Sequence, residues 1–297
     1  MAEVKTDKRM KENKEVTKEV EKAQDNYIDE RVKKITEEAV ESINLVAKVI
    51  ELLDKKEKDK ALEEIANILG KLEVLIARDP NLQLVPVDVR EQVVDFPGTI
   101  DDVEAAKTEV VALIKAGEVQ VARDIMLNLA SELDIFVTAL PIGTYPVVLK
   151  AIIPLIEQEK YDEAKALLIE ALETLVVEKI VIPLPILRAE QAIIRANDLA
   201  NKENPNKDEL KELLAYAKEQ LKLAEVLGYG KVEINYKDLY EEISKLEKLL
   251  EGEESTKDVF QTLKEKLSKI MAGFNKPKAP TQMPKAQNEE DKKEESK

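Results

Sequence analysis

Carboxylates are the side chains left for acid–base chemistry in this sequence, because it contains no His and no Cys. Glu170 and Glu173 share one face of a helical pattern, and Glu190 and Arg195 bracket a short apolar run. A partly buried Glu190–Arg195 ion pair could shift the pKa of the carboxyl group and make it a candidate acid or base. In a chain with 36% charged residues, the simpler interpretation is a solvated helix face. We therefore expect no catalytic residue.

The other familiar designs of catalytic and cofactor sites are also missing. Without His there is no Ser-His-Asp triad, and without Cys there is no thiol nucleophile or thiolate zinc site. None of the eight glycines belongs to a phosphate-binding loop of the Gly-x-x-x-x-Gly-Lys or Gly-x-Gly-x-x-Gly type. Residues Asn201–Asp208 offer oxygen ligands but lack the central glycine of a calcium loop. The sequence therefore predicts no enzyme, no cofactor and no metal site, and a function in binding.

The charge balance restricts the class of partner. A net charge of −15 argues against sequence-independent binding to nucleic acid, which requires a surplus of Lys and Arg. No window approaches the roughly 18 apolar residues of a membrane span, so we expect no insertion into a membrane. Residues 1–4 do not resemble a signal peptide. The chain is therefore expected to be cytoplasmic, or to be exported after loss of a signal.

Composition and periodicity together predict an all-α fold of helical hairpins packed into a bundle-like domain. Aromatic residues make up only 4% of the chain and Trp is absent, so the core must be aliphatic, which suits helix packing. Apolar residues recur every three or four positions over most of the sequence. The exception is 79–98, where Pro80, Pro86 and Pro97 interrupt short β-branched runs. We expect any strand to be confined to this extended or β excursion.

The same periodicity divides the chain into segments. Residues 1–15 are almost all polar and are expected to be disordered, as is the Lys-, Glu- and Pro-rich tail 273–297. Residues 16–78 read as a long amphipathic helical segment. Thr99 can cap a helix that continues past Gly117 to about Phe136. Further helices are predicted at Val147–Glu159, Asp162–Glu173, Ile186–Leu199, Asp208–Leu227, Tyr236–Leu250 and Thr256–Met271.

Three segments resemble copies of one helical hairpin when they are aligned on Ala61, Ala122 and Ala164. Large aliphatic residues recur eight positions before each alanine and eleven positions after it, at Leu53, Ile114 and Ile156 and at Leu72, Leu133 and Leu175. A small residue lets two helices approach closely, and the large residues can fill the space between hairpins. The segments could form a repeat scaffold with a concave binding face, or they could show only the general pattern of packed hairpins.

Several sequence blocks, taken in order and spacing, resemble the YfdX family. The most specific are Ile182-Pro183-Leu184-Pro185 and Leu223-Ala224-Glu225-Val226-Leu227-Gly228-Tyr229-Gly230, and they follow Tyr145-Pro146, Pro154-Leu155-Ile156 and Tyr161-Asp162-Glu163-Ala164. The resemblance assigns residues 79–272 to a YfdX-like helical domain. It implies a bacterial, typically exported protein that is associated with acid and drug stress, with no catalytic residues to carry over.

The residues that carry the resemblance are interpreted first as structural elements. Gly228 follows an apolar helix and can form its C-cap at positive φ. Pro183 and Pro185 make a rigid extended connector, with Pro185 in the first turn of the next helix. An interaction role is the alternative. The complete set of structural or interaction candidates is Tyr145, Pro146, Pro154, Tyr161, Pro183, Pro185, Gly228, Tyr229 and Gly230.

The function expected from these observations is non-enzymatic binding in a stress response. The ligands would be small hydrophobic molecules or, in a chaperone-like role, apolar segments of client proteins, and the protein would self-associate. A periplasmic location follows if a signal peptide was removed, and a cytoplasmic one otherwise. The alternative is a structural or adaptor protein whose hairpins recognise one specific protein partner.

Overall fold

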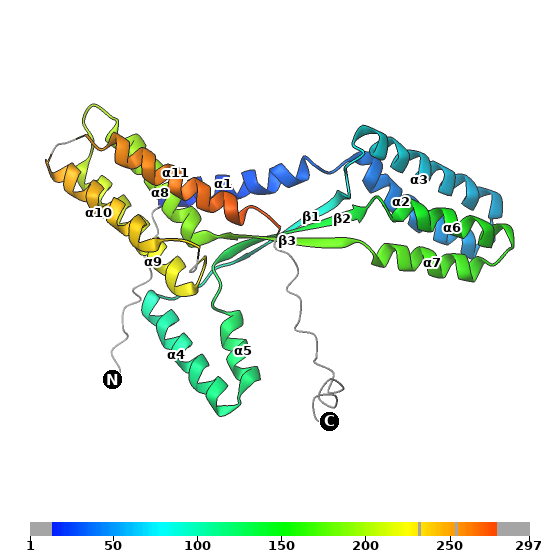
Figure 1. Ribbon diagram of the computed structural model, residues 1–297, viewed down its shortest axis with the longest axis horizontal. Helices are drawn as coiled ribbons and strands as arrows, with labels where there is room; N and C mark the ends of the chain where they lie inside the picture. The colour runs from blue at the N-terminus through cyan, green and yellow to red at the C-terminus, as the bar shows by residue number, and fades with distance from the viewer. Residues whose placement is uncertain (1–13, 231–232, 253–254, 278–297) are drawn as a thin grey trace, which may run out of the picture.

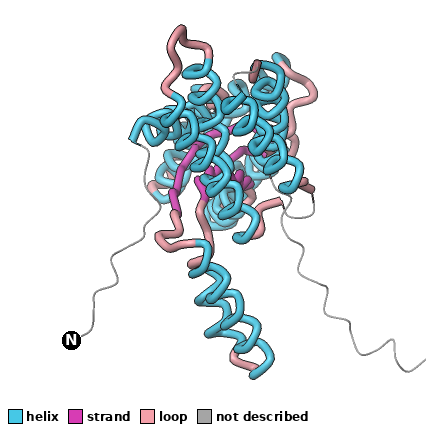
Figure 2. Tube along the Cα trace, turned by 90° about the vertical axis from the view of Figure 1, so that its left-hand side faces the viewer, coloured by secondary structure: helices cyan, strands magenta, loops and turns pink. Residues whose placement is uncertain are grey.

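The computed structural model describes residues 14–230, 233–252 and 255–277, and it shows an elongated, mostly helical molecule (Figure 1). Two helical lobes lie at its ends, and a long antiparallel sheet joins them. A separate two-helix hairpin projects sideways from the body (Figures 1 and 2). The predicted fold class, mostly α with a small β element, is confirmed.

One lobe, which we call the distal bundle, contains α2 (Glu37–Asp54), α3 (Lys58–Arg78), α6 (Tyr145–Glu157) and α7 (Tyr161–Glu173). The hairpin α2–α3 packs against the hairpin α6–α7, with α2 against α7 and α3 against α6. The apolar stripe of each helix faces a shared aliphatic core, which includes Val46, Ile65, Leu149 and Leu168. Two hairpins that are distant in sequence therefore complete one four-helix bundle.

The other lobe, which we call the proximal lobe, contains α1 (Lys14–Val32), α8 (Leu184–Ala200), α9 (Lys207–Leu227), α10 (Tyr236–Gly252) and α11 (Lys257–Phe274). Helix α8 lies at its centre and contacts α1, α9 and α11. The side chain of Asn206 accepts hydrogen bonds from the N–H groups of Asp208 and Glu209 and so caps α9. The Asn206 side-chain oxygen, which belongs to the segment considered above for calcium binding, therefore caps this helix.

The sheet that joins the lobes is formed by β1 (Leu84–Val94), β2 (Glu132–Pro141) and β3 (Val176–Pro183), in the order β1-β2-β3 and antiparallel throughout. Leu133, Ile135 and Ile182 lie in the core of the proximal lobe. Val85 and Leu140, near the other end of the sheet, lie in the core of the distal bundle. Each end of the sheet is therefore anchored in a different lobe.

The projecting hairpin consists of α4 (Ile100–Ala116) and α5 (Val119–Leu127), between β1 and β2. Thr99 and Asp102 form a reciprocal capping box at the start of α4, as the sequence predicted for Thr99. Val103 packs with Leu223 and Val226 of α9, and the Lys107 ammonium donates a hydrogen bond to the carbonyl of Val226 at 2.9 Å. Only the base of the hairpin is thus attached to the proximal lobe.

The three sequence segments that resemble each other are three hairpins with the same turn. The residue before each second helix donates its N–H to a leucine carbonyl five positions earlier, at 2.9 Å in Glu57, Glu118 and Lys160 alike. The preceding residue has positive φ in each turn: 56° in Lys56, 84° in Gly117 and 57° in Glu159. Ala61, Ala122 and Ala164 are fully buried. The similarity of the segments therefore reflects one local structure.

Two expectations about local structure were wrong. Strands were expected only within 79–98, where β1 lies, but β2 and β3 lie outside this range. The helix predicted to run from Thr99 past Gly117 to about Phe136 is divided at Gly117 into α4 and α5. Helix α5 ends at Leu127, and Phe136 is in β2. Leu133, Ile135 and Val137 alternate with Glu132, Asp134 and Phe136, which is the period of a strand with one buried face.

The other helix predictions agree with α6 to α11 within a few residues. Segment 16–78 is helical as expected but is divided into α1, α2 and α3. The disorder predicted for 1–15 and 273–297 falls mainly outside the described residues. No helix in the described ranges combines the length and apolar character needed to cross a membrane.

Candidate functional site

The Leu-Gly-Tyr-Gly block forms the turn that ends α9. Gly228 has φ of 93°, and its N–H and that of Tyr229 donate to the carbonyl of Ala224 at 3.1 and 3.0 Å. Gly230 has φ of 58°, and a Cβ there would stand 2.5 Å from the Ile234 side chain. Both glycines are therefore required by the backbone, the second also by a close approach. The C-cap predicted for Gly228 is confirmed.

Gly228→Val is expected to lower the free energy of unfolding by about 1–2 kcal/mol, because a β-branched residue is strained at positive φ. The space around an added Cβ is empty, so backbone strain rather than a clash determines the cost. Chemical denaturation followed by circular dichroism measures the change. Gly228→Asn is the matched control and should cost less, since Asn tolerates this conformation. Equal stability of Gly228→Val and wild type would contradict the C-cap.

Tyr229 connects this turn to the start of β2. Its hydroxyl accepts a hydrogen bond from the N–H of Ser131 and donates one to Glu132 Oε2, both at 2.8 Å. The hydroxyl of Tyr236 in turn donates to the carbonyl of Tyr229 at 2.6 Å. Burial is the main cause that raises the pKa of Tyr229, so the phenol stays protonated and can keep donating to Glu132.

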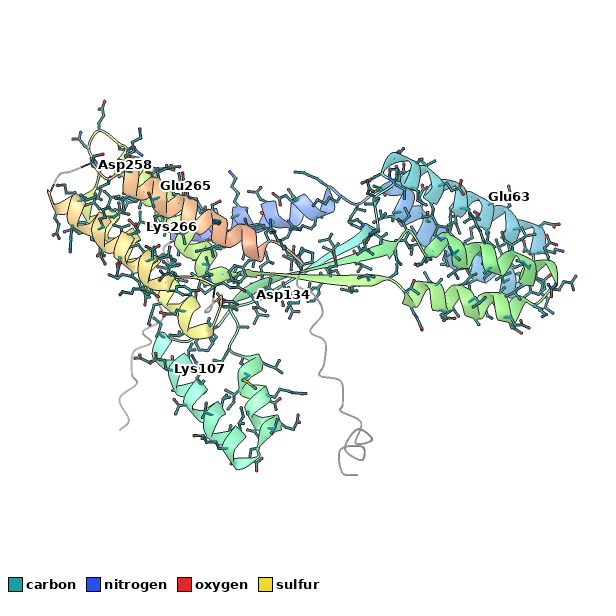
Figure 3. All side chains as sticks on the ribbon, viewed as in Figure 1. Glu63, Lys107, Asp134, Asp258, Glu265 and Lys266 are labelled. Atoms are coloured by element: carbon teal, nitrogen blue, oxygen red, sulfur yellow. The ribbon has the colours of Figure 1, made fainter. Side chains whose placement is uncertain are left out.

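Charged side chains extend this network across the sheet around Asp134, which is labelled in Figure 3. Lys179 Nζ lies 2.7 Å from Asp134 Oδ2 and 3.5 Å from Glu132 Oε1. Burial raises the pKa of the Asp134 carboxyl group, whereas Lys179 lowers it by a smaller amount. Directly after β1, Asp95 accepts hydrogen bonds from both terminal guanidinium nitrogens of Arg188. The network holds the ends of β1, β2 and β3 against the proximal lobe, so its evident role is structural.

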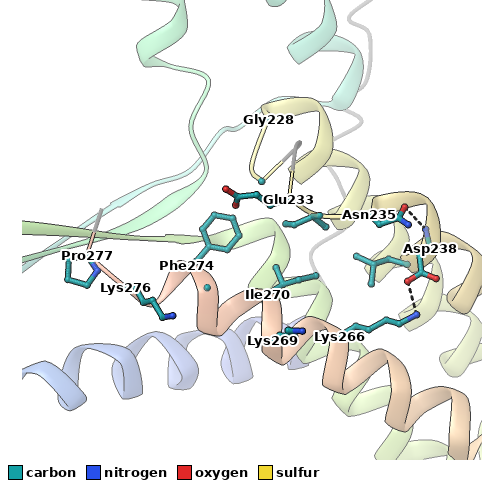
Figure 4. A pocket seen from close by; sticks show the side chains of 14 residues that line it. Gly228, Glu233, Asn235, Asp238, Lys266, Lys269, Ile270, Phe274, Lys276 and Pro277 are labelled. Atoms are coloured by element: carbon teal, nitrogen blue, oxygen red, sulfur yellow. Dashed lines mark hydrogen bonds and ion pairs between the residues drawn. The ribbon is translucent and has the colours of Figure 1, made fainter. Parts of the chain in front are cut away.

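A cavity of about 810 Å³ lies beside the same turn, between the α9–α10 connection and the last turns of α11 (Figure 4). Its apolar wall is formed by Ile234, Leu239, Ile270 and Phe274. Its polar rim includes Glu233, Asp238, Lys266, Lys269 and Lys276. Lys266 is held by Asp238 at 2.7 Å and by Glu242 at 3.2 Å.

The ionisable groups that line this cavity are the ammonium groups of three Lys and the carboxylates of Glu233 and Asp238. The Asp238 carboxylate raises the pKa of Lys266, which therefore remains charged and cannot act as a base. The residues that the structure describes contain no group of three Asp or Glu side chains suited to a metal ion. An apolar wall with a few polar groups at the rim is instead typical of a site for a small molecule.

The predicted candidate residues do not form one site. Gly228 and Gly230 line the cavity, and Tyr229 packs next to it. Pro183 ends β3 and Pro185 lies in the first turn of α8, as predicted for the connector. Four other candidates lie in the distal bundle: Tyr145 and Pro146 start α6, Pro154 lies inside it, and Tyr161 starts α7. The two groups are therefore separated by the length of the sheet.

The environment of Glu190 differs from the one expected from the sequence. Its side chain is half-buried and burial raises its pKa to about 7, so Glu190 is not the fully solvated residue that was expected. The ion pair considered for it is not formed, since Arg195 binds Glu15, Glu19 and Glu209 instead. Glu190 lies near Tyr27 of α1, whose pKa it raises.

Sequence reasoning missed the network around Tyr229. Its members Asp95, Ser131, Glu132, Asp134, Lys179 and Arg188 were not singled out. The alternation of polar and apolar residues from Glu132 onward was the available signal, because it places Glu132 and Asp134 on one face of a strand. Nothing local could indicate that Tyr229, 97 residues away, would donate to Glu132.

Comparisons with known proteins identify a family. The family model described as YfdX protein matches residues 39–181, from α2 to β3. The Ile-Pro-Leu-Pro and Leu-Gly-Tyr-Gly blocks begin after this range. A solved structure of Salmonella Typhi YfdX matches 50% of this chain and 93% of its own, with 15% identity and a TM-score of 0.36. No curated protein sequence matches the chain. Residues 39–181 therefore match the YfdX family, as the resemblance predicted.

Proposed function

We propose that the protein is a non-enzymatic binding protein that takes small apolar molecules into the cavity beside Gly228. The observation that carries this proposal is the cavity itself, whose volume of about 810 Å³ suits a drug-sized ligand. Ile234, Ile270 and Phe274 would cover the apolar body of the ligand. Lys269 and Lys276 at the rim favour a ligand that also carries an anionic group.

A thermal-shift measurement with 1-anilinonaphthalene-8-sulfonate, which has apolar rings and a sulfonate, tests this proposal. A ligand that binds only the folded chain, present at about 100 times its Kd, adds about 2.7 kcal/mol of stability. For a chain of this size the melting temperature should then rise by about 5 °C. Unrelated apolar ligands with an anionic group should also stabilise the protein.

Gly273→Trp is the variant that locates the binding site. Gly273 lines the cavity, and a Cβ at this helical position meets nothing within 4 Å, so the added ring should fill the cavity without disturbing the core. The matched control is Gly70→Trp, since Gly70 is also helical and equally open but lies in the distal bundle. Loss of the thermal shift in Gly273→Trp alone supports the site. A shift retained in both variants would refute this site, whereas no shift in wild type would refute ligand binding and favour the adaptor alternative.

The family adds further parts to the proposal. A role in stress, chaperone-like binding of client proteins and a periplasmic location are supported by the match to the YfdX family alone. Fractionation of the source cells tests the location. Suppression of the aggregation of a heat-denatured client tests the chaperone-like role. Self-association is also part of the proposal, and the structure suggests a surface for it.

A further inference from the structure

The hairpin α4–α5 repeats the local structure of the other two hairpins but lacks their partner. In the distal bundle, Leu53 and Ile156 occupy equivalent positions and are 2% and 0% exposed, because each hairpin covers the other. The equivalent residue of α4 is Ile114, which is 49% exposed. Similarly, Ile65 and Leu168 are fully buried, whereas the equivalent Met126 is 45% exposed. The face that joins hairpins in the bundle is thus uncovered in α4–α5.

This uncovered face consists of Val111, Ile114, Val119 and Met126, each between 45% and 54% exposed. It occupies the outer part of the hairpin, because the base is attached to α9 through Val103 and Lys107. Figure 2 shows the hairpin extending well beyond the rest of the molecule. Adjacent, half-exposed aliphatic residues at the positions that pack elsewhere in the same chain indicate a protein interface rather than an ordinary solvated surface.

We propose that the uncovered face binds the same face of a second copy of this chain, so that two α4–α5 hairpins form an intermolecular four-helix bundle. The precedent lies within the chain, where two hairpins of the same local structure bury these positions against each other. A twofold symmetric interface requires a surface that is complementary to itself. The uncovered face meets this requirement in its apolar residues.

The charges determine how the two hairpins are oriented. Lys115 and Arg123 lie towards the tip of the hairpin, together with Glu118 and Asp124. The arrangement inside the distal bundle has both tips together, and there Asp54 binds Lys165 at 2.6 Å. At the equivalent positions two copies would bring Lys115 against Arg123, so the antiparallel arrangement is favoured.

This interface rests on the self-association proposed above and is independent of the ligand cavity. Sedimentation or light scattering of the full chain should give the mass of a dimer, or of a larger assembly built from dimers. Ile114→Asp should halve that mass, because a charge would be buried in the interface. Ile169→Asp is the matched control, since Ile169 of α7 is 45% exposed and lies outside the face. Circular dichroism confirms that both variants are folded.

Each outcome decides a different point. A monomeric wild type would overturn both self-association and the interface, and would leave the hairpin to a different protein. An Ile114→Asp variant with the mass of wild type would keep self-association but overturn this interface. Neither result would affect the thermal shift with the sulfonate probe, which tests the cavity alone.

Charge reversal tests the antiparallel orientation. Lys115→Glu should change the association of an antiparallel pair by no more than about twofold, whereas it would strengthen a pair with both tips together, because the repulsion between Lys115 and Arg123 would become an attraction. The chain has no Cys, so Glu118→Cys places a single thiol in the hairpin turn. In an antiparallel pair the two turns lie at opposite ends and no disulfide should form between copies. Rapid formation of a disulfide-linked dimer through position 118 would overturn the antiparallel arrangement.

Discussion

Glu190→Gln is expected to raise the free energy of unfolding at pH 8 by up to about 3 kcal/mol and to leave it unchanged near pH 4. Burial raises the pKa of this carboxyl group to about 7, against an ordinary value of 4.5. One pKa unit corresponds to about 1.4 kcal/mol, so the shift sets the upper limit of the effect. The neutral amide of Gln has nearly the same shape and does not ionise.

The sign follows from the protons bound in each state. Between about pH 4.5 and 7 the unfolded chain has lost the proton of Glu190 while the folded chain retains it, so stability falls as pH rises. Above pH 7 both states are ionised and the penalty is constant. Below pH 4.5 both states are protonated and Glu190 contributes no penalty. The benefit of Gln should therefore appear across this window and remain at higher pH.

Chemical denaturation at pH 4, 6 and 8 measures this dependence. Glu170→Gln is the control, because Glu170 is exposed on α7 and its replacement should change stability little at any of these pH values. Since the chain has no His, few other side chains titrate in this range and the difference between the two variants reports Glu190. A benefit of equal size at pH 4 and pH 8 would show that Glu190 acts through packing and not through its charge.

The sequence was sufficient to predict most helices, because each buries one face and its aliphatic residues recur with the helical period. Helices α8 to α11 illustrate this, since Ala189, Ile193 and Ala196 in α8 are all fully buried. Strand β2 carries the alternation of a strand from Glu132 onward, which was overlooked, but β3 could not be located from periodicity. Val176 and Val177 are exposed in β3, whereas Ile180 to Pro183 are all buried, so this strand shows no regular alternation.

The candidate site was predictable only where it depends on local geometry. The C-cap at Gly228 follows from a glycine after an apolar helix, and the extended connector follows from Pro183 and Pro185. The cavity could not be predicted, because Ile234 and Phe274 come from segments that meet only in the folded protein. The burial of Glu190 likewise depends on α1 packing against α8. Tertiary packing, which a pattern of neighbouring residues does not encode, determines these features.

The three hairpins also show that tertiary packing cannot be predicted from a local pattern, and the second prediction of a large effect compares two of them. Ile156→Ala is expected to lower the free energy of unfolding by about 3–4 kcal/mol, because it removes buried methyl and methylene groups and leaves a cavity between two hairpins. Ile114→Ala at the equivalent position should cost less than about 0.5 kcal/mol, provided that the protein is dilute enough to be monomeric. An isoleucine at the same position of the same local structure should therefore contribute strongly to stability in α6 and very little in α4.

Equilibrium denaturation in urea measures both variants, and Leu53→Ala extends the comparison. Leu53 is 2% exposed at the third equivalent position and should behave like Ile156. If the cost of Ile114→Ala grows with protein concentration while the cost of Ile156→Ala does not, the first residue is buried by association and the second within the chain. Comparable losses for Ile114→Ala and Ile156→Ala in dilute protein would show that α4–α5 is already covered in the single chain, which would contradict the exposed face on which the proposed interface depends.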